Sequence, residues 1–138
     1  MSPPLYVLLD GDRVGEKIDG HYLRNDVHDL YLFARELDDA VARLAASIRE
    51  IGGTIYLAGG DNVLGTVEDL NAFLAVFDTS RPRLPVPFSV GIGEDPRQAH
   101  LALRVAKANG FGTVVRAEGV DGGLRFARRT DDGRWVDA

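Results

Sequence analysis

The sequence predicts an α+β domain in which an antiparallel sheet carries packed helices. Short apolar runs, bounded by Gly, Asp and Asn, alternate with longer segments whose apolar residues recur at three- and four-residue steps. A length of 138 residues suits one hydrophobic core, and no repeat, low-complexity tract or linker divides the chain. The composition, 45% hydrophobic and 27% charged, is typical of a globular protein. We therefore expect one domain over residues 1–138.

Short apolar runs predict the strands. The first covers residues 5–9 and stops at Asp10-Gly11-Asp12. Two further runs flank Gly59-Gly60-Asp61-Asn62, a junction that is typical of a β-hairpin. The strands of this hairpin are expected at residues 54–58 and 63–67, and three further strands at residues 88–93, 113–117 and 124–128. A terminal hairpin is expected through Asp132-Gly133 to Trp135-Val136.

Helical periodicity predicts three helices. Apolar residues spaced by three and four over residues 30–51 indicate an amphipathic helix of about six turns, which Gly52-Gly53 ends. A shorter helix is expected over residues 68–77, followed by a proline-rich loop. Asp95 is an N-cap candidate for a helix over residues 96–109, with Pro96 in its first turn. Residues 13–27 fit a loop or a short helix.

The order of these elements predicts a ferredoxin-like βαββαβ core, followed by a helix, a strand and a C-terminal hairpin. In that topology the first strand and the mid-chain hairpin are neighbours at the centre of the sheet. Asp10, at the end of the first strand, is therefore expected near Asp61, at the tip of the hairpin.

Two carboxylates from different segments repel each other unless a positive charge lies between them. Mg²⁺ prefers oxygen ligands and takes one or two carboxylates together with substrate phosphates. The pair Asp10 and Asp61 therefore predicts a magnesium site, with Asp12 and Asn62 as further oxygen donors. Asp and Asn also favour turns, and that simpler explanation stays open for each residue taken alone.

Three further features are compatible with phosphate binding. Gly59 and Gly60 would allow a ligand to approach the backbone, although a plain hairpin turn explains them equally well. Arg13-Val14-Gly15 could direct backbone N–H groups toward a triphosphate. Lys107, near the end of its helix, fits either a phosphate contact or a favourable interaction with the helix dipole.

Composition excludes several classes of function. The absence of cysteine excludes disulfides, thiolate metal sites and a thiol nucleophile. The net charge of −5 argues against binding to duplex nucleic acid. Acidic residues dominate residues 1–96, whereas residues 97–129 hold 7 Lys and Arg against 2 Asp and Glu. The N-terminal residues lack the pattern of a signal peptide or a membrane span, so we expect a cytoplasmic protein without direct membrane binding.

Four segments together resemble the palm domain shared by type III CRISPR polymerase subunits, GGDEF-type diguanylate cyclases and class III nucleotidyl cyclases. They are Leu8 to Gly15, Leu57 to Asn62, Phe88 to Gly93 and Ala102 to Gly110. The hairpin reads Gly-Gly-Asp-Asn rather than the Gly-Gly-Glu-Glu/Asp-Phe of diguanylate cyclases, and the chain is short. It is thus most similar to the minimal CRISPR polymerase (mCpol) family.

The resemblance implies a role for each matching residue. Asp10 and Asp61 would be carboxylate metal ligands, and the Gly11 carbonyl a backbone ligand. Catalytic roles would fall to Asp10, Asp61 and Asn62. The nucleotide-binding residues would be Asp12, Arg13, Val14, Gly15, Gly59, Gly60 and Lys107. Asn62 departs from the family pattern, which has a second acid there, and this departure should weaken a second ion.

The resemblance also implies an activity and partners. It implies synthesis of a cyclic di- or oligonucleotide second messenger from ATP, or from GTP, with two Mg²⁺ or Mn²⁺ ions, in anti-phage signalling. A homodimer and a separate membrane effector that binds the product would be the partners. Three alternatives stay open: a catalytically silent nucleotide sensor, a hydrolase similar to archaeal GTP cyclohydrolases, and a structural or RNA-binding module.

Overall fold

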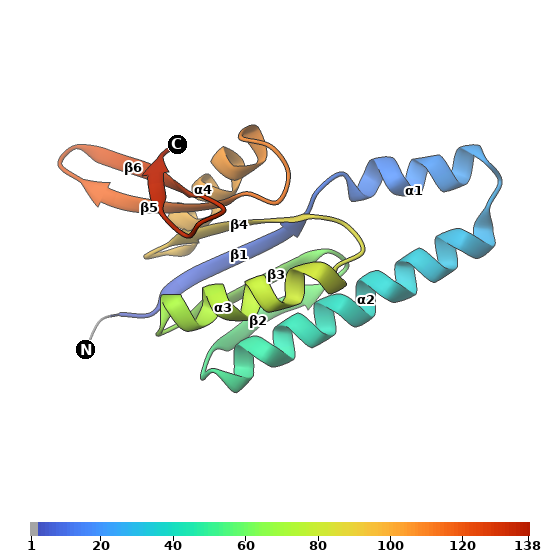
Figure 1. Cartoon of the computed structure of the whole chain (residues 1–138), viewed down its shortest axis with the longest axis horizontal. Coiled ribbons are helices and arrows are strands. Elements are labelled where there is room, and N and C mark those ends of the chain that lie inside the picture. The colour runs from blue at the N-terminus through green and yellow to red at the C-terminus, as the bar shows by residue number, and fades with distance from the viewer. Residues whose placement is uncertain (1–2) are drawn as a thin grey trace.

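Seven strands form one sheet in the computed structural model, which describes residues 3–138 (Figure 1). Residues 1 and 2, part of the segment on which the prediction about a signal peptide rests, lie outside this range. The strands are β1 (Leu5–Gly11), β2 (Thr54–Gly59), β3 (Asn62–Val67), β4 (Phe88–Gly93), β5 (Val114–Val120), β6 (Gly123–Arg129) and β7 (Trp135–Asp137). The helices are α1 (Val14–Leu23), α2 (Val27–Glu50), α3 (Leu70–Ser80) and α4 (Pro96–Ala108), with a 3₁₀ turn at Arg81–Arg83.

The strand order confirms the predicted ferredoxin-like core. The sheet runs β2-β3-β1-β4-β5-β6-β7, so β1 lies between β3 and β4, and β2–β3 forms the expected hairpin. All neighbouring strands are antiparallel except β4 and β5, which are parallel. The connection through α4 accounts for this exception, because parallel neighbours need a crossover.

Helices α2 and α3 cover one face of the sheet and enclose the main core. The apolar stripe of α2 packs on alternate residues of the central strands, such as Val7, Leu9 and Ile92. The side chains of Asp26 and Asp69 accept hydrogen bonds from the backbone N–H groups of Asp29 and Ala72, and these N-caps begin α2 and α3.

Helix α4 packs on the opposite face, against β4 and β5. Asp95 is its N-cap, as predicted, and accepts a hydrogen bond from the N–H of Gln98. The approach is close because Gly91 lacks a side chain: a Cβ atom there would lie 2.1 Å from the carbonyl oxygen of Ala99. The buried face of α4 is correspondingly small, with Ala99, Ala102 and Ala106. This contact fixes the distance between α4 and the sheet.

The structure decides one open alternative and shifts the bounds of one predicted helix. Residues 13–27 contain a ten-residue helix, α1, which extends beyond the end of β1 before the chain turns back into α2 (Figure 1). Helix α3, which was expected over residues 68–77, begins at Leu70 because the Asp69 side chain is its N-cap, and it continues to Ser80.

In residues 3–138, no helix combines the length and the apolar character that crossing a bilayer requires.

Candidate active site

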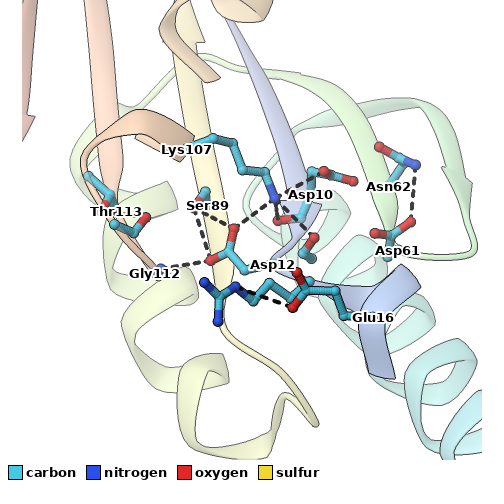
Figure 2. Close-up of polar contacts among 12 residues, drawn as sticks. Asp10, Asp12, Glu16, Asp61, Asn62, Ser89, Lys107, Gly112 and Thr113 are labelled. Atoms are coloured by element: carbon cyan, nitrogen blue, oxygen red, sulfur yellow. Dashed lines mark hydrogen bonds and ion pairs between the residues drawn. The ribbon is translucent and has the colours of Figure 1, made fainter. Parts of the chain in front are cut away.

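The ammonium group of Lys107 is the centre of a charged cluster at the carboxyl end of β1. Its Nζ lies 3.1 Å from Asp10 Oδ2 and 2.7 Å from Asp12 Oδ1, and it donates to the carbonyl oxygen of Gly11 at 2.9 Å. Figure 2 shows the lysine side chain reaching from α4 to both carboxylates. Helix α4 thus brings a cation to the point where β1 ends.

Asp12 anchors this cluster from within the protein. It is 4% exposed, and its carboxylate accepts hydrogen bonds from the Ser89 hydroxyl at 2.9 Å and from the backbone N–H of Gly112 at 2.8 Å, besides the contact with Lys107. These partners satisfy the buried charge. Asp12 therefore ties the end of β1 to β4 and to the loop that follows α4.

Asp61, at the tip of the β2–β3 hairpin, lies beside Asp10. The register pairs Asp10 with Asn62, and the Gly11 N–H donates to the Asp61 carbonyl at 3.1 Å. A Cβ atom on Gly11 would lie 3.3 Å from Asp61 Oδ2, so glycine leaves room for that carboxylate. The Asn62 amide donates to Asp61 Oδ1 at 3.3 Å (Figure 2). The predicted proximity of Asp10 and Asp61 is thus present in the structure.

The ionisation of the cluster reflects its surplus of negative charge. Partial burial, followed by the charge of Asp10 and a hydrogen bond with it, raises the pKa of Asp61 above its ordinary value of 3.8. Burial alone would lower the pKa of Lys107, but its hydrogen bonds and ion pairs with Asp12 and Asp10 raise that pKa above 10.5. The site therefore stabilises a positive charge among its oxygen atoms.

The donor set fits Mg²⁺ or Mn²⁺. Two partly exposed carboxylates, those of Asp10 and Asp61, lie with the Gly11 carbonyl at one edge of the sheet. In residues 3–138, no group of three or more His, Cys, Asp or Glu side chains is placed to hold a metal ion. Mg²⁺ commonly uses one or two carboxylates and completes its shell with water and substrate phosphates. The ammonium of Lys107 already shows that the Asp10 carboxylate and the Gly11 carbonyl accept a cation.

The other residues predicted for nucleotide binding surround this cluster. Arg13 adopts a left-handed conformation with φ 56°, and Val14 and Gly15 form the first turn of α1, whose N–H groups point away from the helix. Gly60, with φ 57°, makes the hairpin turn beside Gly59, and both glycines have open space around them. Their roles in binding stay predictions.

Sequence reasoning missed two partners of the cluster, Ser89 and Gly112. Ser89 is a polar residue within an otherwise apolar and glycine-containing strand, and this was a usable signal. Gly112 offered none, because its N–H reaches Asp12 through the path of a loop. Both residues act on the site through the Asp12 carboxylate.

Comparison with protein families identifies the chain. Residues 6–117 match the minimal CRISPR polymerase (mCpol) domain. The chain belongs to the mCpol family. No curated protein matches it. The matched range contains Asp10, Asp61 and Lys107, so the charged cluster lies within the mCpol domain.

Solved structures share the mCpol chain's fold. The adenylyl cyclase CyaB from P. aeruginosa matches with a TM-score of 0.61 and 14% identity, over 98% of this chain and 94% of that one. The guanylyl cyclase Cya2 matches with a TM-score of 0.58 and 16% identity, over 83% and 74%. An EAL/GGDEF domain protein from M. capsulatus matches with a TM-score of 0.57 and 20% identity, over 82% and 84%. The mCpol chain therefore has the palm fold that these nucleotide cyclases share.

Proposed function

We propose that the protein is a nucleotidyltransferase that makes a cyclic di- or oligonucleotide second messenger, with ATP as the first candidate substrate and GTP as the second. The observation that carries this proposal is the convergence of the Asp10 and Asp61 carboxylates beside the Lys107 ammonium. Family membership and the cyclase fold support the same reaction class. We further propose a role in anti-phage signalling through a separate membrane effector.

In the proposed reaction, a 2′ or 3′ hydroxyl oxygen of one nucleotide attacks the α-phosphorus of another. A P–O bond forms to that oxygen, the bond between the α-phosphorus and the bridging oxygen breaks, and pyrophosphate leaves while the hydroxyl proton passes to solvent. Two Mg²⁺ or Mn²⁺ ions, held by Asp10, Asp61 and the Gly11 carbonyl, would neutralise phosphate charge and acidify the hydroxyl. Lys107 would bind the departing phosphates, together with N–H groups of Val14 and Gly15.

A homodimer belongs to this proposal, because two nucleotides must meet for their joining. Beside the site, on the sheet face that carries α4, this helix packs against β4, β5 and part of β1 and leaves most of β3 and β2 open. Leu8, Tyr56, Leu57 and Leu64 lie there, partly or largely exposed, and the Tyr56 ring stacks on that of Tyr6. A second copy of the chain would cover these apolar side chains.

The decisive experiment incubates the protein with α-labelled ATP or GTP and Mn²⁺ and analyses the products. We expect a cyclic product and released pyrophosphate, both lost in Asp61→Ala. Asp121→Ala, which removes an exposed carboxylate in the β5–β6 turn, should keep the activity. Absence of any product that depends on Asp61 would contradict the enzymatic proposal.

A second candidate, a catalytically silent nucleotide sensor, is favoured by Asn62. Its amide stands where the family has a second acid and donates a hydrogen bond to Asp61, so it brings no negative charge to the site. Calorimetry that detects nucleotide binding, together with an absence of pyrophosphate release, would select this candidate. Release of formate from GTP would instead select a cyclohydrolase-like reaction.

A further inference from the structure

A cavity of about 430 Å³ lies beside Asp12. Its wall is formed mainly by nonpolar atoms of Val86, Pro87 and Phe111, and its rim carries the charged side chains of Arg13, Glu16 and Lys17. This size is in the range of small-molecule sites, which are also mostly apolar with a few polar groups. The cavity therefore has the volume and the lining of a ligand subsite.

Phe111 gives this cavity an exposed aromatic ring. Phe111 lies in the loop between α4 and β5 and is 54% exposed, whereas most phenylalanines are buried. The next residue, Gly112, is fixed by its hydrogen bond to the buried Asp12 carboxylate. The guanidinium of Arg13 lies 4.2 Å from the centre of the ring, and Glu16 pairs with Arg13 at 3.4 Å. The guanidinium therefore lies over the Phe111 ring, with the Glu16 carboxylate beside it.

The backbone of Arg13 adopts a left-handed conformation. Non-glycine residues adopt this conformation rarely, because it brings the Cβ atom close to the following carbonyl oxygen. In this chain it directs the Arg13 side chain toward Phe111 directly after the strand that carries Asp10 and Asp12. The strain therefore serves the geometry of the cavity wall.

The cavity adjoins the candidate active site. Asp12 lines it and also binds the Lys107 ammonium at 2.7 Å, while Gly112, next to Phe111, donates to the same carboxylate. A nucleotide whose phosphates lie at Lys107 and the first turn of α1 would have its base within reach of this wall. Aromatic rings and guanidinium planes are the groups on which bases stack.

We propose that this cavity binds the nucleobase of a substrate nucleotide, with the Phe111–Arg13 pair as its stacking wall. The inference rests on the proposed nucleotide function and adds the residue that recognises the base. Stacking requires a flat π-system but little hydrogen bonding, so Phe111 contributes affinity for any base. Inorganic phosphates, which have no ring, gain nothing from it.

The test compares two ligands by calorimetry in the presence of Mg²⁺: ATP, and inorganic tripolyphosphate, which lacks the nucleoside. Phe111→Leu keeps an apolar side chain and removes the π-system, and Phe111→Trp restores one. Tyr31→Ala is the matched control, since Tyr31 is 55% exposed and lies beneath an arginine, Arg35, but away from the cavity. We expect Phe111→Leu to weaken ATP binding about tenfold or more and to leave tripolyphosphate binding unchanged.

Each outcome separates the two proposals. Wild-type affinity for ATP in Phe111→Leu, or equal weakening of both ligands, would overturn the base subsite and leave the nucleotide function standing. Retained ATP affinity in Phe111→Trp and in Tyr31→Ala would support the subsite. Failure of the wild-type protein to bind either ligand would overturn the proposed function, and the subsite with it.

Discussion

At the scale of single residues, the site is defined by an imbalance of charge. Three carboxylates, those of Asp10, Asp12 and Asp61, lie around one ammonium group, that of Lys107. Asp12 and Lys107 form a closely bonded pair, so the remaining negative charge falls on Asp10 and Asp61. Like charges at short range raise the free energy of the folded protein until a cation joins them.

Asp61→Asn should therefore remove a pH-dependent loss of stability from the metal-free protein. Because the pKa of Asp61 is raised on folding, the folded state holds its proton more tightly than the unfolded state above pH 3.8. The contribution of Asp61 to the free energy of unfolding is therefore largest below pH 3.8 and falls as the pH rises through the folded-state pKa. In the variant, we expect this decrease in the free energy of unfolding to be absent. Urea unfolding in EDTA, between about pH 4 and about pH 7, measures it.

The same variant should lose stabilisation by Mn²⁺. Thermal unfolding with and without the ion provides this second readout. A variant whose stability follows the same pH dependence as the wild type, or that gains as much from Mn²⁺, would contradict the assignment of Asp61 as a carboxylate that a cation neutralises.

Asn62→Asp tests the position at which the resemblance to the mCpol family implies a second acid. The change replaces an amide that donates to Asp61 with a third negative charge beside Asp10 and Asp61. We expect the metal-free protein to lose up to about 1 kcal/mol of stability, as for partly exposed charge pairs. In Mn²⁺ the order should reverse, with a larger gain in melting temperature than in the wild type. An equal gain in both proteins would show that residue 62 does not take part in ion binding.

At the scale of elements, the contact between β4 and α4 positions Lys107. Gly91 faces the backbone of α4 so closely that a methyl group would meet the Ala99 carbonyl and the Leu103 N–H, at 2.1 and 2.4 Å. The helix therefore approaches the sheet backbone directly. Lys107, one residue before the end of α4, reaches the end of β1 as a result.

Gly91→Ala should move α4 away from the sheet. We expect a destabilisation of about 1–3 kcal/mol or more, as for overpacked cores, together with loss of nucleotidyl transfer. Gly119→Ala is the matched control, because Gly119 also lies in a strand and has open space around it. Denaturant unfolding and the labelled-nucleotide assay compare the two variants. Similar stability and activity in both would show that the β4–α4 contact tolerates a methyl group and does not fix Lys107.

The elements that sequence predicted best are those with strong local signals. Asp95 and Pro96 define the start of α4, and the Gly59-to-Asn62 junction defines the hairpin. Helix α1 was not resolved from sequence because its apolar residues that reach the core, Val14 and Ile18, are few. The proximity of Asp10 and Asp61 followed from the topology.

The details of the site were beyond sequence reasoning because they depend on long-range contacts of individual side chains. Ser89 and Gly112 lie 77 and 100 residues from Asp12, and no spacing rule connects them with it. Similarly, the stack of Arg13 on Phe111 arises from the path of two loops. Topology predicts which strand ends meet, whereas packing decides which side chains fill the space.

At the scale of the whole molecule, the two faces of the sheet are covered unequally. Helices α2 and α3 cover one face (Figure 1). On the other face, α4 packs against β4, β5 and part of β1 and leaves most of β3 and β2 open. The open part carries apolar side chains and adjoins Asp10 and Asn62. An association through this face would place two candidate active sites toward each other, as the joining of two nucleotides requires.

Leu57→Arg should therefore separate the proposed dimer and reduce activity without unfolding the protein. Leu57 is 55% exposed on the open face, so arginine would add a charge that a second copy cannot easily bury. Leu23→Arg is the matched control, since Leu23 is 86% exposed on α1, away from the sheet.

Sedimentation measures the mass of each protein in solution, and activity per chain is measured against protein concentration. The wild type and Leu23→Arg should show dimers and activity per chain that rises with concentration. Leu57→Arg should stay monomeric and inactive at the same melting temperature. A monomeric wild type with constant activity per chain would contradict the shared site, and a dimeric Leu57→Arg would place the interface elsewhere.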